Sequence, residues 1–169
     1  MDIRVVARTG ILPEITRQTY ESLAKALREA VMNAIDAGAS EVHVDLSRVG
    51  EGFLRIVDDG SGMALDDLRE HFFALGGSTR SDDAEKFGRI GIGSLALLGF
   101  GDAVRIRSRG RLGRGVEAVV SMPSGGGGLD PLAETTLGRA SEVRDIERPA
   151  MLSAKGETFT EVCVEGLSD

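Results

Sequence analysis

The sequence predicts an α+β fold in which helices pack on one face of a mixed, largely antiparallel sheet. The first observation is that segments with the alternating pattern of half-buried strands outnumber helical segments, and several follow one another directly. The second is one long segment, ending near Ala37, that carries an apolar stripe at helical spacing. The chain has 169 residues, of which 41% are hydrophobic, enough for the core of a single domain.

The N-terminal half is expected to begin with a strand at residues 3–7, followed by a short helical turn that starts at Pro13. The long helix follows, with Thr16 or Thr19 as its N-cap and Gly38 in position for a left-handed C-terminal cap. Its predicted buried stripe consists of Leu23, Leu27, Ala30, Ala34 and Ile35.

The next strands are expected at residues 41–46 and 53–57, joined by a hairpin turn at 50–52. A helix is predicted over 64–75, because Asp66 and Asp67 would lie in its first turn, where the helix dipole favours acidic groups.

The C-terminal half alternates between glycine-rich breaks and apolar segments. A mobile loop is predicted at 76–87 and a flexible glycine-rich loop at about 123–130. The expected ordered elements are an apolar helix at 94–98 and strands at 104–108, 116–121, around 141–146 and 158–164.

Composition excludes several classes of function. The net charge is −7, no lysine-rich stripe occurs, aromatic content is 4% and tryptophan is absent, so we expect no direct nucleic-acid binding by this domain. The single cysteine, Cys163, excludes an internal disulfide framework and fits a reducing compartment. The histidines His43 and His71 are isolated in the sequence, so they do not form the ligand pattern of a zinc site. With no leader pattern and no long apolar run, we expect a cytoplasmic protein without membrane contact.

Three polar residues of the long helix, Glu29, Asn33 and Asp36, follow one another at i, i+4 and i+7 along one face. A carboxylate and an amide one turn apart can hold a hydrated Mg²⁺ and a water, with the glutamate as general base. The alternative is a solvated helix face that carries a few acids. We expect Asp36 to be structural.

Two further segments suggest nucleotide chemistry. Asp58 comes at the end of a predicted strand, just before Gly60 and Gly62, so its carboxylate could accept a hydrogen bond from the amino group of an adenine. An ordinary Asp-Gly turn is the competing interpretation. The glycines of residues 88–93 precede a helix, an arrangement that can cradle phosphates, although it can also serve close helix packing. It has neither the Rossmann spacing nor a Walker lysine.

Together, in this order, the three motifs resemble the GHKL ATPases: DNA gyrase B, the ninety-kilodalton heat-shock chaperones, histidine kinases and MutL. The resemblance extends from about residue 19 to residue 167. It implies a Bergerat-type two-layer α/β sandwich, formed by residues 1–169 as one ATP-binding domain with residues 76–87 as its lid. It also implies ATP and Mg²⁺ as cofactors, with slow hydrolysis of ATP to ADP.

The resemblance implies a role for each matching residue. Glu29 would position or activate the attacking water, and Asn33 would coordinate Mg²⁺. Asp58 would accept the hydrogen bond of the adenine amino group, with Gly60 and Gly62 beside the base and Met63 covering it. The residues implied to reach the nucleotide from the lid and to hold its phosphates are Ser78, Thr79, Gly88, Arg89, Ile90, Gly91, Ile92, Gly93 and Ser94.

Two departures from the family pattern stand out. The last motif is usually Gly-Thr on a strand, but here Phe159 precedes Thr160. We favour Thr160 as the motif threonine because the apolar positions after it fit better, and Thr158 in Gly156-Glu157-Thr158 is the competing choice. Ser94 also replaces the bulkier or charged residues of several branches.

The wording of the first motif resembles the MutL and chaperone branches more than the histidine kinases. We therefore expect the chain to be the N-terminal part of a larger protein whose next domain supplies a cation to the γ-phosphate. ATP would close the lid and promote dimerisation. A nucleotide-binding latch without hydrolysis and a histidine kinase catalytic domain are the alternatives.

Overall fold

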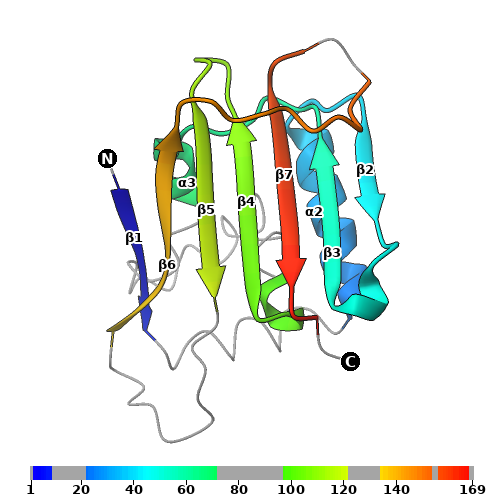
Figure 1. The fold of residues 1–169 in the computed structure, drawn as a ribbon, viewed down its shortest axis with the longest axis vertical. Coiled ribbons are helices and arrows are strands. Elements are labelled where there is room, and N and C mark those ends of the chain that lie inside the picture. Colours follow the sequence, from blue (N-terminus) through cyan, green and yellow to red (C-terminus); the bar gives the residue numbers. More distant parts are fainter. Residues whose placement is uncertain (1, 9–21, 72–96, 122–133, 154–155, 168–169) are drawn as a thin grey trace, which may run out of the picture.

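The computed structural model describes residues 2–8, 22–71, 97–121, 134–153 and 156–167. Seven strands form one sheet in the order β1-β6-β5-β4-β7-β3-β2, and all six pairings between them are antiparallel (Figure 1). The strands are β1 (Asp2–Arg8), β2 (Val42–Asp45), β3 (Phe53–Asp58), β4 (Ala103–Arg109), β5 (Gly115–Ser121), β6 (Glu134–Val143) and β7 (Phe159–Glu165).

Helices α2 (Leu23–Asp36) and α3 (Leu65–His71) lie on the same face of the sheet, α2 behind β7 and β3 and α3 behind β5 and β6 (Figure 1). Two short 3-10 helices, η1 (Val49–Glu51) and η4 (Leu97–Phe100), precede β3 and β4. The core fills the space between the layers, because every second residue of the central strands points toward the helices. The predicted α+β sandwich with helices on one face is confirmed.

Helix α2 differs from its prediction at two points. Its N-cap is Ser22, which has an extended backbone and whose hydroxyl accepts a hydrogen bond from the Lys25 amide at 3.3 Å. The proposed caps Thr16 and Thr19 lie outside the described residues. Ile35 is 52% exposed instead of buried, because the stripe that packs on the sheet runs through alanines at a spacing of four: Ala26, Ala30 and Ala34.

At the other end of α2, Gly38 has a φ of +77° and forms the predicted left-handed termination. The predicted turn at 50–52 is a 3-10 turn, η1, closed by Gly52 in the left-handed conformation. The predicted helix at 64–75 is described as α3 up to His71, and of the predicted helix at 94–98 only the residues from 97 on are described, as the 3-10 helix η4.

The strand expected around 141–146 is wrong in position, since β6 ends at Val143 and begins at Glu134. The register between β1 and β6 shifts between Val5 and Val6, and this irregularity interrupts the strict alternation by which strands are recognised. The predicted loops at 76–87 and about 123–130 lie outside the described residues.

The other face of the sheet is covered in part by residues 144–153, which contact the ends of the strands. The side chains of Arg107 and Arg109 donate hydrogen bonds to backbone carbonyls of this segment. A second apolar cluster lies beneath it, formed by Val57, Ile146, Leu152 and Phe159. Within the described residues, we find no helix with the length and apolar character that a membrane crossing requires.

Candidate functional site

The two predicted site residues that lie on the sheet, Asp58 and Thr160, are found together at one edge of it. At this edge β3 and β4 end and β7 begins, the upper edge in Figure 1. Asp58 is the last residue of β3, and the loop that follows it, residues 59–64, connects β3 to α3. In the register of β3 and β7, Asp58 lies directly opposite Thr160. The edge therefore brings together residues about one hundred positions apart.

The Asp58 carboxylate is almost fully enclosed, with 7% of the residue exposed. Its Oδ1 accepts a hydrogen bond from the Gly60 amide at 2.9 Å. Burial raises the pKa of Asp58 to about 6; the Gly60 bond opposes this shift and the charge of Asp59 adds to it. A buried carboxylate with one internal donor keeps lone pairs that can accept a hydrogen bond from a bound ligand.

The neighbouring carboxylate, Asp59, accepts hydrogen bonds from other residues of the chain. Its oxygens accept hydrogen bonds from the amides of Ser40 and Glu41, both at 2.7 Å, and from the Ser40 hydroxyl at 2.5 Å. Burial opposes ionisation, but these bonds outweigh it and hold the pKa of Asp59 below its usual value. Asp59 therefore fastens the residues after α2 to this loop, whereas Asp58 accepts fewer hydrogen bonds from the described residues.

Two glycines let the loop fit between α2 and β4. A Cβ at Gly60 would lie 3.0 Å from Cβ of Ala37, next to the point where the Ser61 amide donates to the Ala37 carbonyl at 2.9 Å. Gly62 has a φ of +64°, and a Cβ there would collide with the carbonyl oxygen of Arg109. The loop is thus held between the C-terminal end of α2 and the end of β4.

A buried hydroxyl, that of Ser108, connects this loop to β7. Ser108 is fully buried; its Oγ accepts a hydrogen bond from the Met63 amide at 2.8 Å and donates one to the Phe159 carbonyl at 2.7 Å. It also lies 3.2 Å from Oγ1 of Thr160, the residue opposite Asp58. Sequence reasoning missed Ser108, because it sits in a strand whose alternation predicts only a buried position.

The two candidate threonines of the last motif are placed differently. Thr160 lies within β7, in register with both Asp58 and Ser108. Thr158 precedes the first residue of β7 and takes no part in this register. The geometry therefore favours Thr160 as the partner of Asp58.

The polar face of α2 contributes Glu29 and Asn33, both half-buried, while Asp36 is exposed. Asn33 lies one turn before Ala37, whose amide donates to the Asn33 carbonyl at 2.9 Å. The side-chain Nδ2 of Asn33 is buried and has no hydrogen-bond partner among the described residues. A buried amide of this kind has unused capacity to bind a ligand.

The rest of the predicted site cannot be placed. The predicted lid, with Ser78 and Thr79, and the glycine motif from Gly88 to Ser94 lie outside the described residues. Their predicted contacts with phosphates therefore remain predictions.

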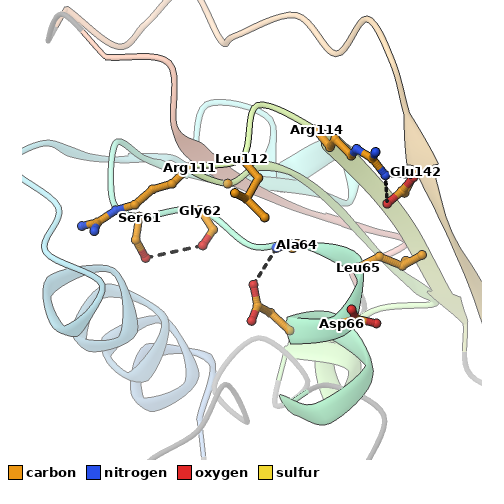
Figure 2. Close-up of a pocket in the computed structure, with 11 residues that line it drawn as sticks. Ser61, Gly62, Ala64, Leu65, Asp66, Arg111, Leu112, Arg114 and Glu142 are labelled. Carbon is orange, nitrogen blue, oxygen red and sulfur yellow. Dashed lines mark hydrogen bonds and ion pairs between the residues drawn. The ribbon is translucent and has the colours of Figure 1, made fainter.

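A cavity of about 800 Å³ lies on the other side of the 61–64 segment (Figure 2). It is lined by the start of α3, the turn between β4 and β5, and Glu142 of β6, which pairs with Arg114. Among the predicted site residues that the structure describes, only Gly62 lines it, while Glu29, Asn33 and Asp58 do not. This cavity is therefore adjacent to the candidate site and distinct from it.

Comparison with known proteins gives two consistent findings. Residues 20–120 match the model of the histidine kinase-, DNA gyrase B- and HSP90-like ATPases. The DNA mismatch repair protein MutL of Brucella anthropi is 32% identical over 151 residues, which are 86% of this chain and 24% of that protein. MutL of Mesorhizobium japonicum is 32% identical over 162 residues, 93% of this chain and 26% of that protein. The chain thus spans about a quarter of the length of these relatives.

Proposed function

Because this chain belongs to the family of histidine kinase-, DNA gyrase B- and HSP90-like ATPases, we propose that it binds ATP with Mg²⁺ and hydrolyses it slowly. The observation that carries this proposal is the Asp58 carboxylate, which is buried at the edge of the sheet beside Thr160 and accepts one hydrogen bond from the described residues. Such a carboxylate suits an exocyclic amine, and adenine carries one next to its ring nitrogens.

The residues of α2 fit the phosphate end of the nucleotide. The side-chain oxygen of Asn33 would hold Mg²⁺, and the Asn33 Nδ2, which has no partner among the described residues, would donate to a phosphate oxygen. Bound there, Mg²⁺ neutralises charge on the phosphates. Glu29, one turn earlier on α2, would orient the attacking water and accept its proton.

The relatives are DNA mismatch repair proteins, and the chain matches about a quarter of their length. We propose that it serves as the ATP-binding domain of a MutL-like protein. ATP binding would close residues 76–87 over the nucleotide and favour association with a second copy. Hydrolysis would reverse both steps.

Calorimetric titration of the full chain with ATP and Mg²⁺ tests the binding site. We expect Asp58→Asn to abolish measurable ATP binding, because its one side-chain oxygen stays bonded to the Gly60 amide and the amide nitrogen that replaces Oδ2 cannot accept from the adenine amine. Asp66→Asn is the matched control, since Asp66 is an exposed carboxylate that lines the cavity of Figure 2. If Asp66→Asn alters the affinity and Asp58→Asn does not, the nucleotide occupies that cavity and the assignment of Asp58 is wrong.

Phosphate release under saturating ATP tests hydrolysis. We expect Glu29→Ala to lower the turnover rate by about 10² to 10⁴ and to leave ATP affinity nearly unchanged, because only the activation of water is lost. Glu51→Ala, which removes an exposed acid of η1, is the control. Unchanged release from Glu29→Ala would remove Glu29 as the base. A parent chain that binds ATP without turnover would support a nucleotide-binding latch.

A further inference from the structure

The hydrogen bonds of the buried Ser108 hydroxyl determine whether the groups around it present donors or acceptors to a bound base. A serine hydroxyl has one proton to donate and two lone pairs to accept with. The Phe159 carbonyl can only accept, and it lies 2.7 Å away, so the Ser108 proton is directed to it. The Met63 amide can only donate, and it takes one lone pair of Ser108 at 2.8 Å.

These two hydrogen bonds determine the direction of the third one, between Ser108 and Thr160. With its proton already donated, Ser108 can only accept from the Thr160 hydroxyl, 3.2 Å away. The proton of Thr160 is thereby turned toward Ser108, and its remaining lone pairs are left for other partners. Ser108, Thr160 and Asp58 share one row across β4, β7 and β3, so this constraint acts beside the recognition carboxylate.

We propose that Ser108 is a positioning residue that makes the base pocket selective for a 6-amino purine over a 6-oxo purine. The inference rests on the proposed function and adds a determinant of its specificity. An ionised Asp58 and a Thr160 whose proton is held by Ser108 both present acceptors only. An exocyclic amine can donate to such a pair, whereas a carbonyl oxygen at the same position would meet their lone pairs.

The same hydroxyl orients the loop that carries the glycines. Met63 follows Gly62 directly, and its amide is held by Ser108 at the point where the Gly62 backbone touches Arg109. Removing the hydroxyl would leave the half-buried Met63 amide and the buried Phe159 carbonyl without this partner, and would free the Thr160 proton to rotate toward the base.

Titration of the full chain with ATP and with ITP tests this role, because the two nucleotides share their phosphates and differ in the 6-amino or 6-oxo group and in the N1 proton that accompanies the 6-oxo group. We expect the parent to bind ATP more tightly, and Ser108→Ala to weaken ATP binding by about tenfold while ITP binding changes much less. The ITP/ATP ratio of dissociation constants would then fall by several-fold. Ser141→Ala, the same change on the opposite face of the sheet in β6, should leave the ratio unchanged.

A second pair of variants separates positioning from structure. In a Thr160→Val background the hydroxyl that Ser108 orients is absent, so adding Ser108→Ala should not change the ratio further. If Ser108→Ala does not fold, Ser108→Cys takes its place in the test. It is close to serine in volume and carries only a weak donor, so it should lower the ITP/ATP ratio of dissociation constants in the same way.

The outcomes distinguish this inference from the function on which it rests. A parent that does not bind ATP would overturn both. A parent that binds ATP and ITP equally, or folded Ser108 variants that weaken both nucleotides by the same factor, would overturn the selectivity role alone. Ser108 would then serve only the packing of the sheet edge.

Discussion

Asp58 and Asp59 are consecutive, yet their surroundings push their pKa values in opposite directions. Burial raises the pKa of Asp58 to about 6, so at neutral pH the folded chain holds a charged, buried carboxylate. Holding this charge lowers the free energy of unfolding. We expect Asp58→Asn to raise the free energy of unfolding above pH 7 by up to roughly 3 kcal/mol, since the amide carries no charge. Denaturant unfolding at several pH values measures this effect.

The pH dependence of that gain has a definite sign. The folded-state pKa lies above the unfolded one, so the unfolding free energy of the parent rises as the pH falls through 6 toward 4. The advantage of Asp58→Asn should therefore shrink over this range and disappear near pH 4. A gain that is equal at pH 4 and pH 8 would show that burial of the charge is not its cause.

The same titration should affect the proposed recognition of the base by Asp58. Below about pH 6 the free Asp58 carboxyl is protonated, and a protonated carboxyl can donate to a 6-oxo group but accepts an amine poorly. We expect the preference for ATP over ITP to fall by up to about tenfold per pH unit below pH 6. Because both nucleotides carry the same phosphates, the ratio of their dissociation constants removes the titration of the phosphates. A ratio that stays constant from pH 8 to pH 5 would contradict the role of Asp58.

At the scale of elements, the loop after β3 depends on one close backbone approach. Gly62→Ala would place a methyl group against the Arg109 carbonyl at a φ of +64°, so we expect a loss of about 3 kcal/mol in stability together with weaker ATP binding. Gly113→Ala is a matched control, since Gly113 has a φ of +75° but nothing within 4 Å of an added Cβ. It should cost about 1 kcal/mol from the backbone conformation alone and leave ATP affinity unchanged. Thermal unfolding and ATP titration of both variants measure the difference, and equal losses would contradict a steric role for Gly62.

Elements with an uninterrupted period could be predicted from the sequence, and elements shaped by their neighbours could not. Strand β4 alternates without a break and was placed within one residue at each end, whereas the irregular pairing of β6 with β1 hides its alternation. Asp58 could be proposed as a candidate because a carboxylate and two glycines lie within five residues. Ser108 could not, since its partners Met63 and Phe159 are 45 and 51 residues away and only the pairing of the strands brings them together.

At the scale of the whole molecule, the candidate site is held by two layers at once. Helix α2 carries Glu29 and Asn33, and the sheet carries Asp58, Ser108 and Thr160, while the loop between β3 and α3 is bonded to both layers. A nucleotide that contacts both layers would stabilise their packing against each other, because it binds the folded chain and has no such site in the unfolded one.

We therefore expect thermal unfolding to report the ligand directly. ATP and Mg²⁺ at about one hundred times the dissociation constant should stabilise the chain by about 2.7 kcal/mol, which corresponds to a rise of about 5 to 10 °C in the midpoint for a domain of this size. Chelation of Mg²⁺ should reduce this shift, and Asn33→Ala should reduce it to the same extent. The midpoint of Asn33→Ala without nucleotide should not fall by more than about 2 °C, because the Asn33 amide nitrogen has no partner among the described residues to lose. Two outcomes would contradict the assignment of Asn33 to the metal. One is a full rise of the midpoint with ATP in the presence of chelator, and the other is a rise in Asn33→Ala that depends on Mg²⁺ as it does in the parent.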